Sequence, residues 1–282
     1  MALLHAFAAH RGPDLSAVAT FDHGTGVAAA EAVDLVVREC LRRGVPVVAG
    51  RAPDGPAGRR TESAWRTARW AFLRAVAAER RATIVTAHTL DDQAETVAIR
   101  ILRGASARGL AAMEAPTPGV VRPLLGIRRA ALAAYAQAER VPFREDPSND
   151  DRAYLRNRLR AELLTAIEAR RPGFGGELVE VGRRAAAWRR DLAALVDQVD
   201  ARIVEGAVVI DAAPLTELTM DGLAIVWPEL AARAGVVMDR RGIARVADWS
   251  TSATAGQRMP LSGGAVVERT ARTFVLRGPR PA

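Results

Sequence analysis

Cysteine and lysine are almost or wholly missing from this sequence. Its 282 residues include one cysteine, Cys40, which excludes an intramolecular disulfide, a Cys-x-x-Cys redox pair and a metal site built from several cysteines. There is no lysine, so all 40 basic residues are arginine, and the formal net charge is +8. This excess favours a polyanionic partner, because arginine pairs well with phosphate. The scarcity of cysteine makes a cytoplasmic location the default expectation.

Long apolar runs and aromatic side chains are also scarce. No run approaches the roughly 18 apolar residues of a membrane span, so no membrane partner is expected. Residues 1–10 are apolar but carry two histidines and no basic start, which is not typical of a signal peptide. Aromatic residues make up 5% of the chain, which argues against a stacking platform for RNA bases.

The order of apolar patterns predicts an α/β fold, with a mostly parallel sheet and helices on both of its faces. The chain is long enough for a second domain as well. Expected strands lie at 16–21, 45–49 and 82–86, and residues 120–124 form either one more strand or an extended segment. Expected helices lie at 1–9, 27–43, 61–81, in the last part of 82–104, at 128–140 and at 152–170.

A break at Arg171-Pro172-Gly173 is the expected domain boundary. It separates a first domain, residues 1–172, from a smaller and mostly helical α+β domain, residues 173–282. The second domain is expected to contain a long helix at 177–204, a strand at 207–210, helices at 221–234 and 240–249 and a β region at 257–276. Within it, Ser262-Gly263-Gly264 is most simply a hairpin turn.

The stretch 82–104 combines a strand with an amphipathic helix. Residues 82–86 are β-branched and apolar, which predicts a strand buried on both faces. Apolar residues then recur at the spacing of one buried helix face: Ala94, Val97, Ala98, Ile101 and Leu102. Gly104 is suited to ending that helix. The helices at 27–43 and 61–81 have similar inner faces, which include Leu41 and Ala64.

Four polar side chains, His88, Asp91, Asp92 and Glu95, lie between this strand and helix. Ligands of open α/β sheets bind where strands end and helices begin, so chemistry is expected here. A structural interpretation stays open, since a helix dipole stabilises first-turn acidic residues by roughly 0.3–1 kcal/mol each and Asp91 could be the N-cap. The three carboxylates repel one another, and a metal ion or a substrate ammonium would relieve this repulsion.

A basic stripe follows the turn-forming segment R-E-D-P-S-N-D at 144–150. Arg152, Arg156 and Arg160 recur at i, i+4 and i+8, opposite an apolar side made of Leu155, Leu159, Leu163 and Ile167. Such a stripe is usually a solvated face. In so basic a chain, contact with phosphate is the competing interpretation.

Several short segments, taken together in their order along the chain, form a recognisable pattern. They are F-D-H-G at 21–24, E-S-A-W-R-T-A-R-W at 62–70, T-A-H-T-L-D-D-Q-A-E-T at 86–96, L-R-G at 102–104, R-G-L-A-A-M at 108–113, R-P-L-L at 122–125, D-P-S-N at 146–149 and R-N-R-L-R at 156–160. Together they resemble the tRNA(Ile)-lysidine synthetases of the PP-loop ATP pyrophosphatase superfamily. The resemblance implies an adenine-nucleotide α-hydrolase-like fold; the second domain matches only loosely.

The resemblance also implies an activity. Such ligases modify C34, the wobble cytidine of the tRNA(Ile) with a CAU anticodon: ATP adenylates the C2 oxygen of the base, and the amine of L-lysine then displaces AMP. Mg²⁺ accompanies the nucleotide. The implied partners are therefore this tRNA, L-lysine and ATP; a homodimer stays open, and the second domain becomes a tRNA-binding or substrate domain.

Roles for individual residues come with the resemblance. The catalytic residues would be His88, Asp91, Asp92, Glu95 and Arg156, with Asp92 and Glu95 holding and deprotonating the lysine amine. Phe21, His23, His88 and Arg156 would bind ATP, with His88 and Arg156 offering cationic or donor groups to its α-phosphate. Asp91 is the expected metal ligand. The residues expected to contact tRNA phosphates are Arg108, Arg152, Arg158, Arg160, Arg183 and Arg184.

One departure from the family pattern concerns ATP. The superfamily has an S-G-G-x-D-S loop after its first strand, and backbone amides of the loop grip the pyrophosphate. In related sequences the loop runs into a helix that begins much like M-A-L-L-H, where this sequence starts. We therefore expect weak or no ATP binding, and an exposed sheet edge or slot in place of the first strand. A misassigned start and a truncated product are the two explanations.

Other functions stay open. A tRNA thiolase or a small-molecule synthetase would keep the ATPase fold, but thiolases of the two-thiocytidine type use several cysteines, and small-molecule synthetases need less arginine. A degenerate remnant would bind tRNA in a salt-sensitive way without adenylation. An ordinary structural α/β domain would leave residues 88–95 without a purpose.

Overall fold

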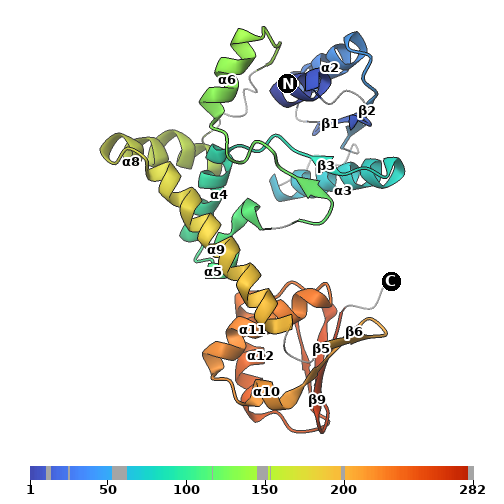
Figure 1. Ribbon diagram of the computed structural model, residues 1–282, viewed down its shortest axis with the longest axis vertical. Helices are drawn as coiled ribbons and strands as arrows, with labels where there is room; N and C mark the ends of the chain where they lie inside the picture. Colours follow the sequence, from blue (N-terminus) through green and yellow to red (C-terminus); the bar gives the residue numbers. More distant parts are fainter. Residues whose placement is uncertain are drawn as a thin grey trace. The chain divides into compact units, whose positions relative to one another are not determined.

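The computed structural model of the chain describes residues 1–10, 14–24, 26–52, 62–115, 117–144, 152, 154–197 and 201–278 (Figure 1). Most of the expected loop at 50–60 and the turn at 145–150 lie outside these residues. The chain forms two compact units, Met1–Ala186 and Ala187–Ala282. This division falls inside a helix, beyond Arg171-Pro172-Gly173, and the domain boundary at residue 172 stays a prediction.

The first unit alternates helices with short strands, as the apolar pattern predicted. Its strands are β1 (Val18–Asp22), β2 (Val47–Arg51), β3 (Ile84–Val85) and β4 (Val120–Val121). Its helices are α1 (Ala2–His10), α2 (Val27–Arg42), α3 (Glu62–Arg80), α4 (Leu90–Leu102), α5 (Ala107–Leu110), α6 (Arg129–Ala138), α7 (Leu155–Arg158) and α8 (Thr165–Arg170). The unit ends within a further helix, α9 (Phe174–Asp197). A 3₁₀ turn, η2 (Ala112–Glu114), follows α5, and a π-helical segment, η4 (Leu159–Leu164), joins α7 to α8.

The strands of this unit form two separate parallel pairs. β1 pairs with β2, with Val18 opposite Val47, and β3 pairs with β4, with Ile84 opposite Val120. The parallel arrangement is the expected one. Within the described part of the chain, however, β1 and β3 are not hydrogen-bonded to each other.

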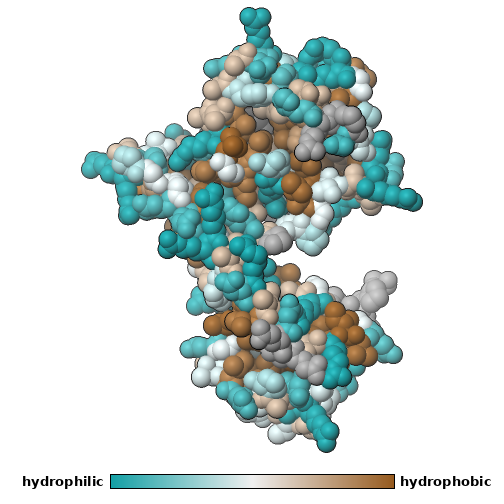
Figure 2. All heavy atoms as spheres, viewed as in Figure 1, coloured by the Kyte–Doolittle hydropathy of each residue, from teal (hydrophilic) through white to brown (hydrophobic). Residues whose placement is uncertain are grey.

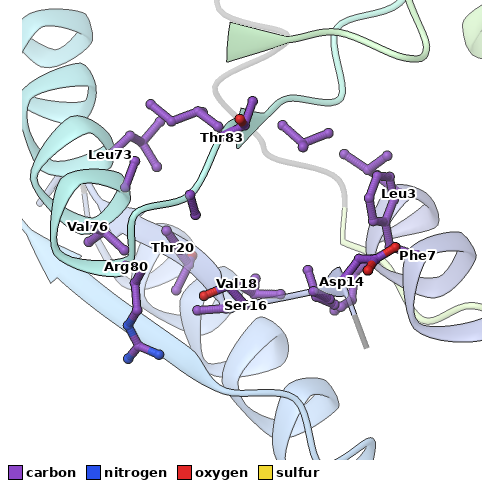
Figure 3. Close-up of a pocket in the computed structure, with 18 of the residues that line it drawn as sticks. Leu3, Phe7, Asp14, Ser16, Val18, Thr20, Leu73, Val76, Arg80 and Thr83 are labelled. Carbon is purple, nitrogen blue, oxygen red and sulfur yellow. The ribbon is translucent and has the colours of Figure 1, made fainter. Parts of the chain in front are cut away.

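A cavity of about 670 Å³ separates β1 from β3. Side chains from four elements surround it: Leu3 and Phe7 from α1, Val18 from β1, Leu73 from α3, and Thr83 just before β3 (Figure 3). Hydrophobic atoms also gather in a hollow between α6 and α3 on the visible face of the unit (Figure 2). A slot is therefore present between the two strand pairs.

Several expectations about burial are wrong. The strand expected at 82–86 is limited to Ile84 and Val85, and Val85 is 36% exposed because its strand has β4 on one side and the cavity on the other. The apolar residues at helix ends are exposed too, because the helices extend beyond the short strands that they cover. These residues are Leu41, Ala64, Ile101 and Leu102. By contrast, Gly104 has φ +66° directly after α4, as expected of a helix stop.

The helix expected at 152–170 begins at Leu155 and contains the π segment η4. Only Leu159 of the expected apolar side is fully buried, whereas Leu155 and Leu163 are exposed. A π turn accommodates more residues per turn than an α-helix, so it rotates the side chains that follow relative to the α-helical spacing. For this reason the expected apolar side is not buried as one continuous face.

The second unit is an antiparallel sheet covered by helices. Its strands are β5 (Ala201–Val204), β6 (Ala207–Asp211), β7 (Arg258–Pro260), β8 (Val266–Arg269) and β9 (Thr273–Arg277), in the order β5-β6-β9-β8-β7. Its helices are α10 (Ala212–Thr216), α11 (Met220–Arg233) and α12 (Arg240–Ser252). Residues 201–204 therefore belong to β5, so the long helix expected to reach residue 204 ends at Asp197.

Large apolar side chains fill the core of the second unit. Trp227 and Phe274 are fully buried and meet edge to face, with ring centroids 5.5 Å apart. The Trp227 indole nitrogen donates to the Ser250 hydroxyl at 2.8 Å. Gly263 and Gly264, with φ +76° and +81°, turn the chain between β7 and β8, which confirms the hairpin turn. Among the described helices, none is long and apolar enough to cross a membrane.

Candidate active site

The start of α4 is closed by Thr89 rather than by Asp91. The Thr89 hydroxyl accepts from the Asp92 amide, while Asp92 Oδ2 accepts from the Thr89 amide and hydroxyl, both at 2.8 Å. This is a reciprocal capping box. Asp91 is already inside the helix, and its Oδ2 accepts from the Arg129 amide at 2.6 Å, at the start of α6. The expectation that Asp91 caps α4 is therefore wrong: it caps a different helix.

Glu95 is the centre of a buried charge cluster. It is 1% exposed and accepts from Arg156 Nε and Arg160 Nε, both at 2.7 Å, and from Arg129 Nη2 at 3.3 Å. Asp92 Oδ1 joins the cluster, accepting from Arg129 at 2.9 Å and Arg156 at 3.1 Å. Three guanidinium groups thus surround two carboxylates, and the cations that relieve carboxylate repulsion belong to the chain itself.

The arginines keep both carboxylates ionised. Burial by itself would raise the pKa of Glu95, but hydrogen bonds from Arg160 and Arg156 bring it below its usual range. Burial acts in the same way on Asp92, and the hydrogen bonds from Thr89 with the charges of Arg129 and Arg156 lower its pKa overall. These carboxylates therefore hold cations well and accept protons poorly.

The stripe of Arg152, Arg156 and Arg160 is not a single solvated face. Arg156 and Arg160 turn inward to Glu95, whereas Arg152 pairs with Glu162 at 2.6 Å on the surface. The π segment between α7 and α8 changes the direction of the side chains along this stretch. Arg160 was expected to contact tRNA, and its guanidinium is instead bonded to a buried carboxylate.

His88 lies next to this cluster, just beyond β3. Burial lowers the pKa of its imidazole to about 4, although the charge of Asp92 acts in the opposite direction. Its Nδ1 is 2.8 Å from the Thr86 hydroxyl. The imidazole is therefore neutral near pH 7 and can offer a hydrogen bond, so the expected cationic role does not fit.

Three more arginines, Arg66, Arg69 and Arg122, act electrostatically on His88. The charges of Arg122, Arg69 and Arg66 all lower the His88 pKa, which places them close to the imidazole. Burial lowers the pKa of Arg69, and the positive charges of Arg66 and Arg156 lower it further. Arg122 donates to Met113 O and Thr117 Oγ1, but its buried Nε has no hydrogen-bond partner among the described residues. This group, the His88 arginine cluster, is an electropositive site suited to phosphate.

Sequence reasoning missed two further residues. Gln93 is fully buried, accepts from the Met113 amide at 2.9 Å and donates to Ala111 O at 3.2 Å, which fixes the η2 turn against α4. Arg129 contributes its amide to Asp91 and its guanidinium to Asp92 and Glu95. The neighbouring Arg128 and the R-P-L-L segment at 122–125 drew attention to this part of the sequence. The spacing of the residues along the sequence, however, did not indicate that Arg129 contacts α4.

Phe21 and His23 stand at the carboxyl end of β1, on the side where α/β sheets bind ligands. Their rings are 5.3 Å apart, and the His23 ring is 6.3 Å from Trp65 on α3. Phe72 packs 5.3 Å from Phe21. The aromatic group is therefore local and small, and an ATP-binding role for Phe21 and His23 stays a prediction.

The remaining arginines of the predicted tRNA surface lie mostly on the outside. Arg158, Arg183 and Arg184 are exposed, and Arg108 on α5 is half-buried. Arg183 lies 3.7 Å from Glu114, and Arg184 pairs with Glu180 at 3.0 Å. Exposed pairs of this kind are weak and exchange readily for phosphate. Contact with tRNA stays a prediction for these residues.

A second cavity, of about 410 Å³, opens beside Glu95. Its lining carries both signs of charge, with Asp91, Glu95 and Glu168 against Arg128, Arg129 and Arg160. Leu164 and Ala169 add an apolar wall. A molecule with both an amine and a carboxylate on an aliphatic chain would match this lining. Among the described residues, no group of three or more His, Cys, Asp or Glu side chains is arranged to hold a metal ion. Asp91 as a metal ligand stays a prediction.

The chain is similar in sequence to known proteins. The PP-loop domain family matches residues 1–167. A tRNA(Ile)-lysidine synthase from Pseudomonas aeruginosa is 41% identical over 170 residues, which cover 58% of this chain and 37% of that protein. One from Mycobacterium bovis is 39% identical over 155 residues, covering 55% of this chain and 46% of that protein.

Another relative is matched over most of its length. The tRNA(Ile)-lysidine synthase of Parasynechococcus marenigrum is 30% identical over 237 residues, covering 80% of this chain and 69% of that protein. The chain spans less than half the length of the Pseudomonas and Mycobacterium relatives. The match across residues 1–167 and the breadth of this last similarity lead to one conclusion: the chain belongs to the PP-loop domain family, and within it to the tRNA(Ile)-lysidine synthase family.

Proposed function

We propose that this chain is an ATP-dependent ligase that joins L-lysine to C2 of C34 in the tRNA(Ile) with a CAU anticodon. The observation that carries the proposal is the juxtaposition of the Asp92–Glu95–Arg156 network with the His88 arginine cluster. The carboxylates of the Asp92–Glu95–Arg156 network suit the binding of an amine, and the His88 arginine cluster suits the phosphates of a nucleotide. The relatives' printed names supply the substrate.

The first step requires stabilisation of phosphate charge. The C2 oxygen of the base attacks the α-phosphorus of ATP, the bond to the β-phosphate oxygen breaks, and diphosphate leaves. Arg66, Arg69 and Arg122 would meet the charge that develops on the phosphates. His88, neutral near pH 7, would donate a hydrogen bond from its free ring nitrogen. Phe21 and His23 would lie against the nucleotide at the end of β1.

The second step requires an amine in the correct place. The ε-amine of lysine attacks C2, AMP leaves with the C2 oxygen, and the amine loses a proton. Asp92 and Glu95 would hold the incoming ammonium by exchange with an arginine partner, because their low pKa favours ion pairing over proton removal. Lysine would enter through the cavity beside Glu95, with Arg128 near its carboxylate and Glu168 near its α-amine. The proton passes to water or to product phosphate.

Mg²⁺ would arrive with the nucleotide. Mg²⁺ usually retains several waters and is held by substrate phosphates with one or two carboxylates. Asp91 is the candidate carboxylate, since one of its oxygens caps α6 and the other has no hydrogen bond to a described residue. A homodimer also stays a prediction, which light scattering of the purified chain would check.

The direct test is transfer of radiolabelled L-lysine to a CAU-anticodon tRNA(Ile) transcript at millimolar ATP and Mg²⁺. Incorporation should require ATP and disappear when C34 of the transcript is replaced by U. It should also disappear in Arg156→Gln, which keeps a polar side chain but no charge. Salt-sensitive tRNA binding without release of AMP would contradict the proposal and favour a tRNA-binding remnant.

A second measurement addresses the nucleotide. The sequence has no S-G-G-x-D-S segment, so stabilisation by ATP and Mg²⁺ should be small in a thermal-shift titration at submillimolar ATP. Clear stabilisation in that range would contradict the expectation of weak ATP binding. Release of AMP that requires a transcript other than tRNA(Ile), or none, would favour another PP-loop ATPase.

A further inference from the structure

Gln93 of α4 holds the main chain of the η2 turn at two points. Its Oε1 accepts from the Met113 amide at 2.9 Å, and its Nε2 donates to the Ala111 carbonyl at 3.2 Å. Between these two contacts Ala112 has φ +49°, in the left-handed region that a non-glycine residue seldom adopts. Such a conformation persists only where surrounding contacts fix it. One fully buried side chain therefore secures this bend of the chain.

The Arg122 guanidinium is anchored on the turn that Gln93 secures. Its Nη1 donates to the Met113 carbonyl at 3.3 Å, and its Nη2 donates to the Thr117 hydroxyl at 3.2 Å. Met113 thus accepts from Arg122 with its carbonyl and donates to Gln93 with its amide. Two hydrogen bonds through the main chain of one residue therefore connect α4 to this arginine.

Strand pairing brings Arg122 close to His88. The Thr86 amide donates to Val121 O at 3.0 Å, so the ends of β3 and β4 lie together. Arg122 directly follows Val121 in the sequence, and the Thr86 hydroxyl is 2.8 Å from His88 Nδ1. Arg122 therefore belongs to the His88 arginine cluster by its place in the fold as well as by its charge.

Repulsion between like charges makes an anchor for Arg122 necessary. Burial lowers the pKa of Arg122, and the positive charge of Arg66 lowers it further. A long arginine side chain without fixed contacts would therefore turn its guanidinium away into water. A guanidinium that is already held in place loses less conformational freedom when a phosphate binds, and this raises the affinity.

We propose that Gln93 is a positioning residue, which holds the Arg122 guanidinium in the His88 arginine cluster for the phosphates of the nucleotide. Gln93 acts through the main chain of Met113 and needs no contact with the ligand. This role rests on the part of the proposed function that assigns phosphates to the cluster. An amide suits the task because it offers an acceptor to Met113 and a donor to Ala111 at once. The ionised carboxylate of a glutamate would lack the donor.

The direct test follows the Arg122 Nε–H by NMR in the full 282-residue chain. This group is buried, so its proton should exchange slowly with water, and loss of the signal in Arg122→Gln identifies it. Gln93→Met keeps the length of the side chain but removes both hydrogen bonds, and it should accelerate the exchange about tenfold. Thr96→Val is the matched control on α4. It removes a hydroxyl that donates to Asp92 O within the same helix, and it should leave the Arg122 exchange unchanged.

Binding of inorganic diphosphate, titrated at constant ionic strength, tests the consequence for the ligand. Gln93→Met and Arg122→Gln should each weaken binding about tenfold, whereas Thr96→Val should not. In the double variant of Gln93 and Arg122, the loss should equal that of Arg122→Gln alone, because Gln93 acts only through this arginine. A residue that merely stabilised the fold would instead give additive losses.

A second pair of variants leaves Gln93 in place and covers the case in which Gln93→Met does not fold. A Cβ at Gly182 of α9 would lie 2.5 Å from Gln93 Nε2, so Gly182→Ala should displace the amide from Ala111. A Cβ at Gly176, on the same helix, would meet nothing within 4 Å. Gly182→Ala should accelerate exchange of the Arg122 Nε–H and weaken diphosphate binding, whereas Gly176→Ala should do neither. Circular dichroism establishes that the variants fold.

Three results would overturn the proposal. Additive losses of diphosphate affinity would show that Gln93 does not act through Arg122. Unchanged exchange of the Arg122 Nε–H in the folded Gln93→Met or Gly182→Ala variant would show that Gln93 does not hold the guanidinium. Absence of diphosphate binding by the unmodified chain would remove the ligand for which the arginine is held. Lysine transfer enters none of these measurements, so its failure beside the expected results would count against the proposed function alone.

Discussion

The two units of the chain bury different kinds of side chain. The second unit buries large apolar residues such as Trp227, Leu230 and Phe274 against a continuous five-stranded sheet. Around α4, the first unit buries mainly small ones, such as Ala94 and Ala98, together with polar side chains. Its strands form two separate pairs with a slot between them.

This difference shows where each unit derives its stability. Apolar packing in the second unit is favourable by itself. The buried Glu95 of the first unit is stable only with its arginine partners, since desolvating a lone carboxylate is very unfavourable. The stability of the first unit around α4 therefore depends on paired buried charges more than on large apolar side chains, as is common in functional regions. Each prediction below breaks or sharpens this contrast.

Truncating the central tryptophan of the second unit should have the largest effect. Trp227→Ala removes a fully buried ring and leaves the Ser250 hydroxyl without its indole donor, so the second unit should lose about 3–5 kcal/mol of stability. Hydrogen exchange of β6 and β9 would report this loss, while exchange in α4 should not change. Trp188→Ala, at a 37% exposed position, is the control and should have a much smaller effect. Equal loss in both variants would contradict a core centred on Trp227.

Removing the buried carboxylate should destabilise the first unit by a similar or slightly smaller amount. Glu95→Ala leaves Arg156 and Arg160 without their main acceptor, and breaking a buried ion pair typically raises the free energy of the fold by about 3–5 kcal/mol. Exchange should accelerate in α4, α7 and α8 but not in the second unit. Glu180→Gln breaks an exposed pair with Arg184 and should change stability by less than about 1 kcal/mol. A stable Glu95→Ala would show that the cluster does not hold the unit together.

Much of the fold could be predicted because its signals are local. The alternation of strands and helices, the end of α4 at Gly104 and the turn at Gly263 each depend on a few neighbouring residues. The proximity of Arg156 to Asp92 and Glu95 was accessible only through resemblance, since these residues are far apart in sequence.

Other features depend on tertiary structure and carry no local signal. The π segment after Arg158 turns Arg160 inward, against the spacing of an ordinary α-helix. Arg129 reaches α4 because α6 begins against Asp91. The low pKa of His88 comes from burial. The alternative in which Asp91 caps α4 failed, because a cap is defined by the amide that the carboxylate meets, and Asp91 meets the Arg129 amide.

The cavity beside Glu95 offers a test of the amine site with little effect on stability. A Cβ at Gly175 would lie 3.7 Å from Glu168 Oε2 and 4.0 Å from Arg128 Nη1, whereas one at Gly176 would meet nothing within 4 Å. Gly175→Leu should raise the KM for L-lysine on the order of tenfold, about 1.4 kcal/mol, and leave the KM for ATP unchanged. Gly176→Leu shares the same helix and is the matched control. A similar lysine KM in both variants would exclude this cavity as the entry route.

The pH dependence of the first unit should be weaker but specific. Because the pKa of His88 is about 4 in the fold, below its ordinary value of 6.5, the unfolded chain binds more protons between these values. Its contribution is fully present above pH 6.5 and is lost as the pH falls toward 4; the lowered pKa values of Asp92 and Glu95 act in the same direction at lower pH. The stability of α4 can be derived from its amide exchange, corrected for the intrinsic exchange rate at each pH. Between pH 7 and 4.5 this stability should fall less steeply in His88→Gln than in the unmodified chain. The exposed His10→Gln should retain the decline, and an identical profile for His88→Gln would contradict the neutral buried imidazole.

The exposed arginines of α9 should matter least for stability and still matter for tRNA. Among the described residues, the ion pairs of Arg183 and Arg184 are exposed or long, so replacing both by Gln should change the unfolding free energy by less than about 1 kcal/mol. If each contacts one phosphate, the slope of log affinity for tRNA against log salt should fall by roughly 0.7–0.9 per residue. Arg38→Gln, on the exposed side of α2, should leave the slope unchanged. An unaltered slope in the double variant would remove α9 from the tRNA surface, and the basic surface would then have to be sought around Arg108 and Arg158.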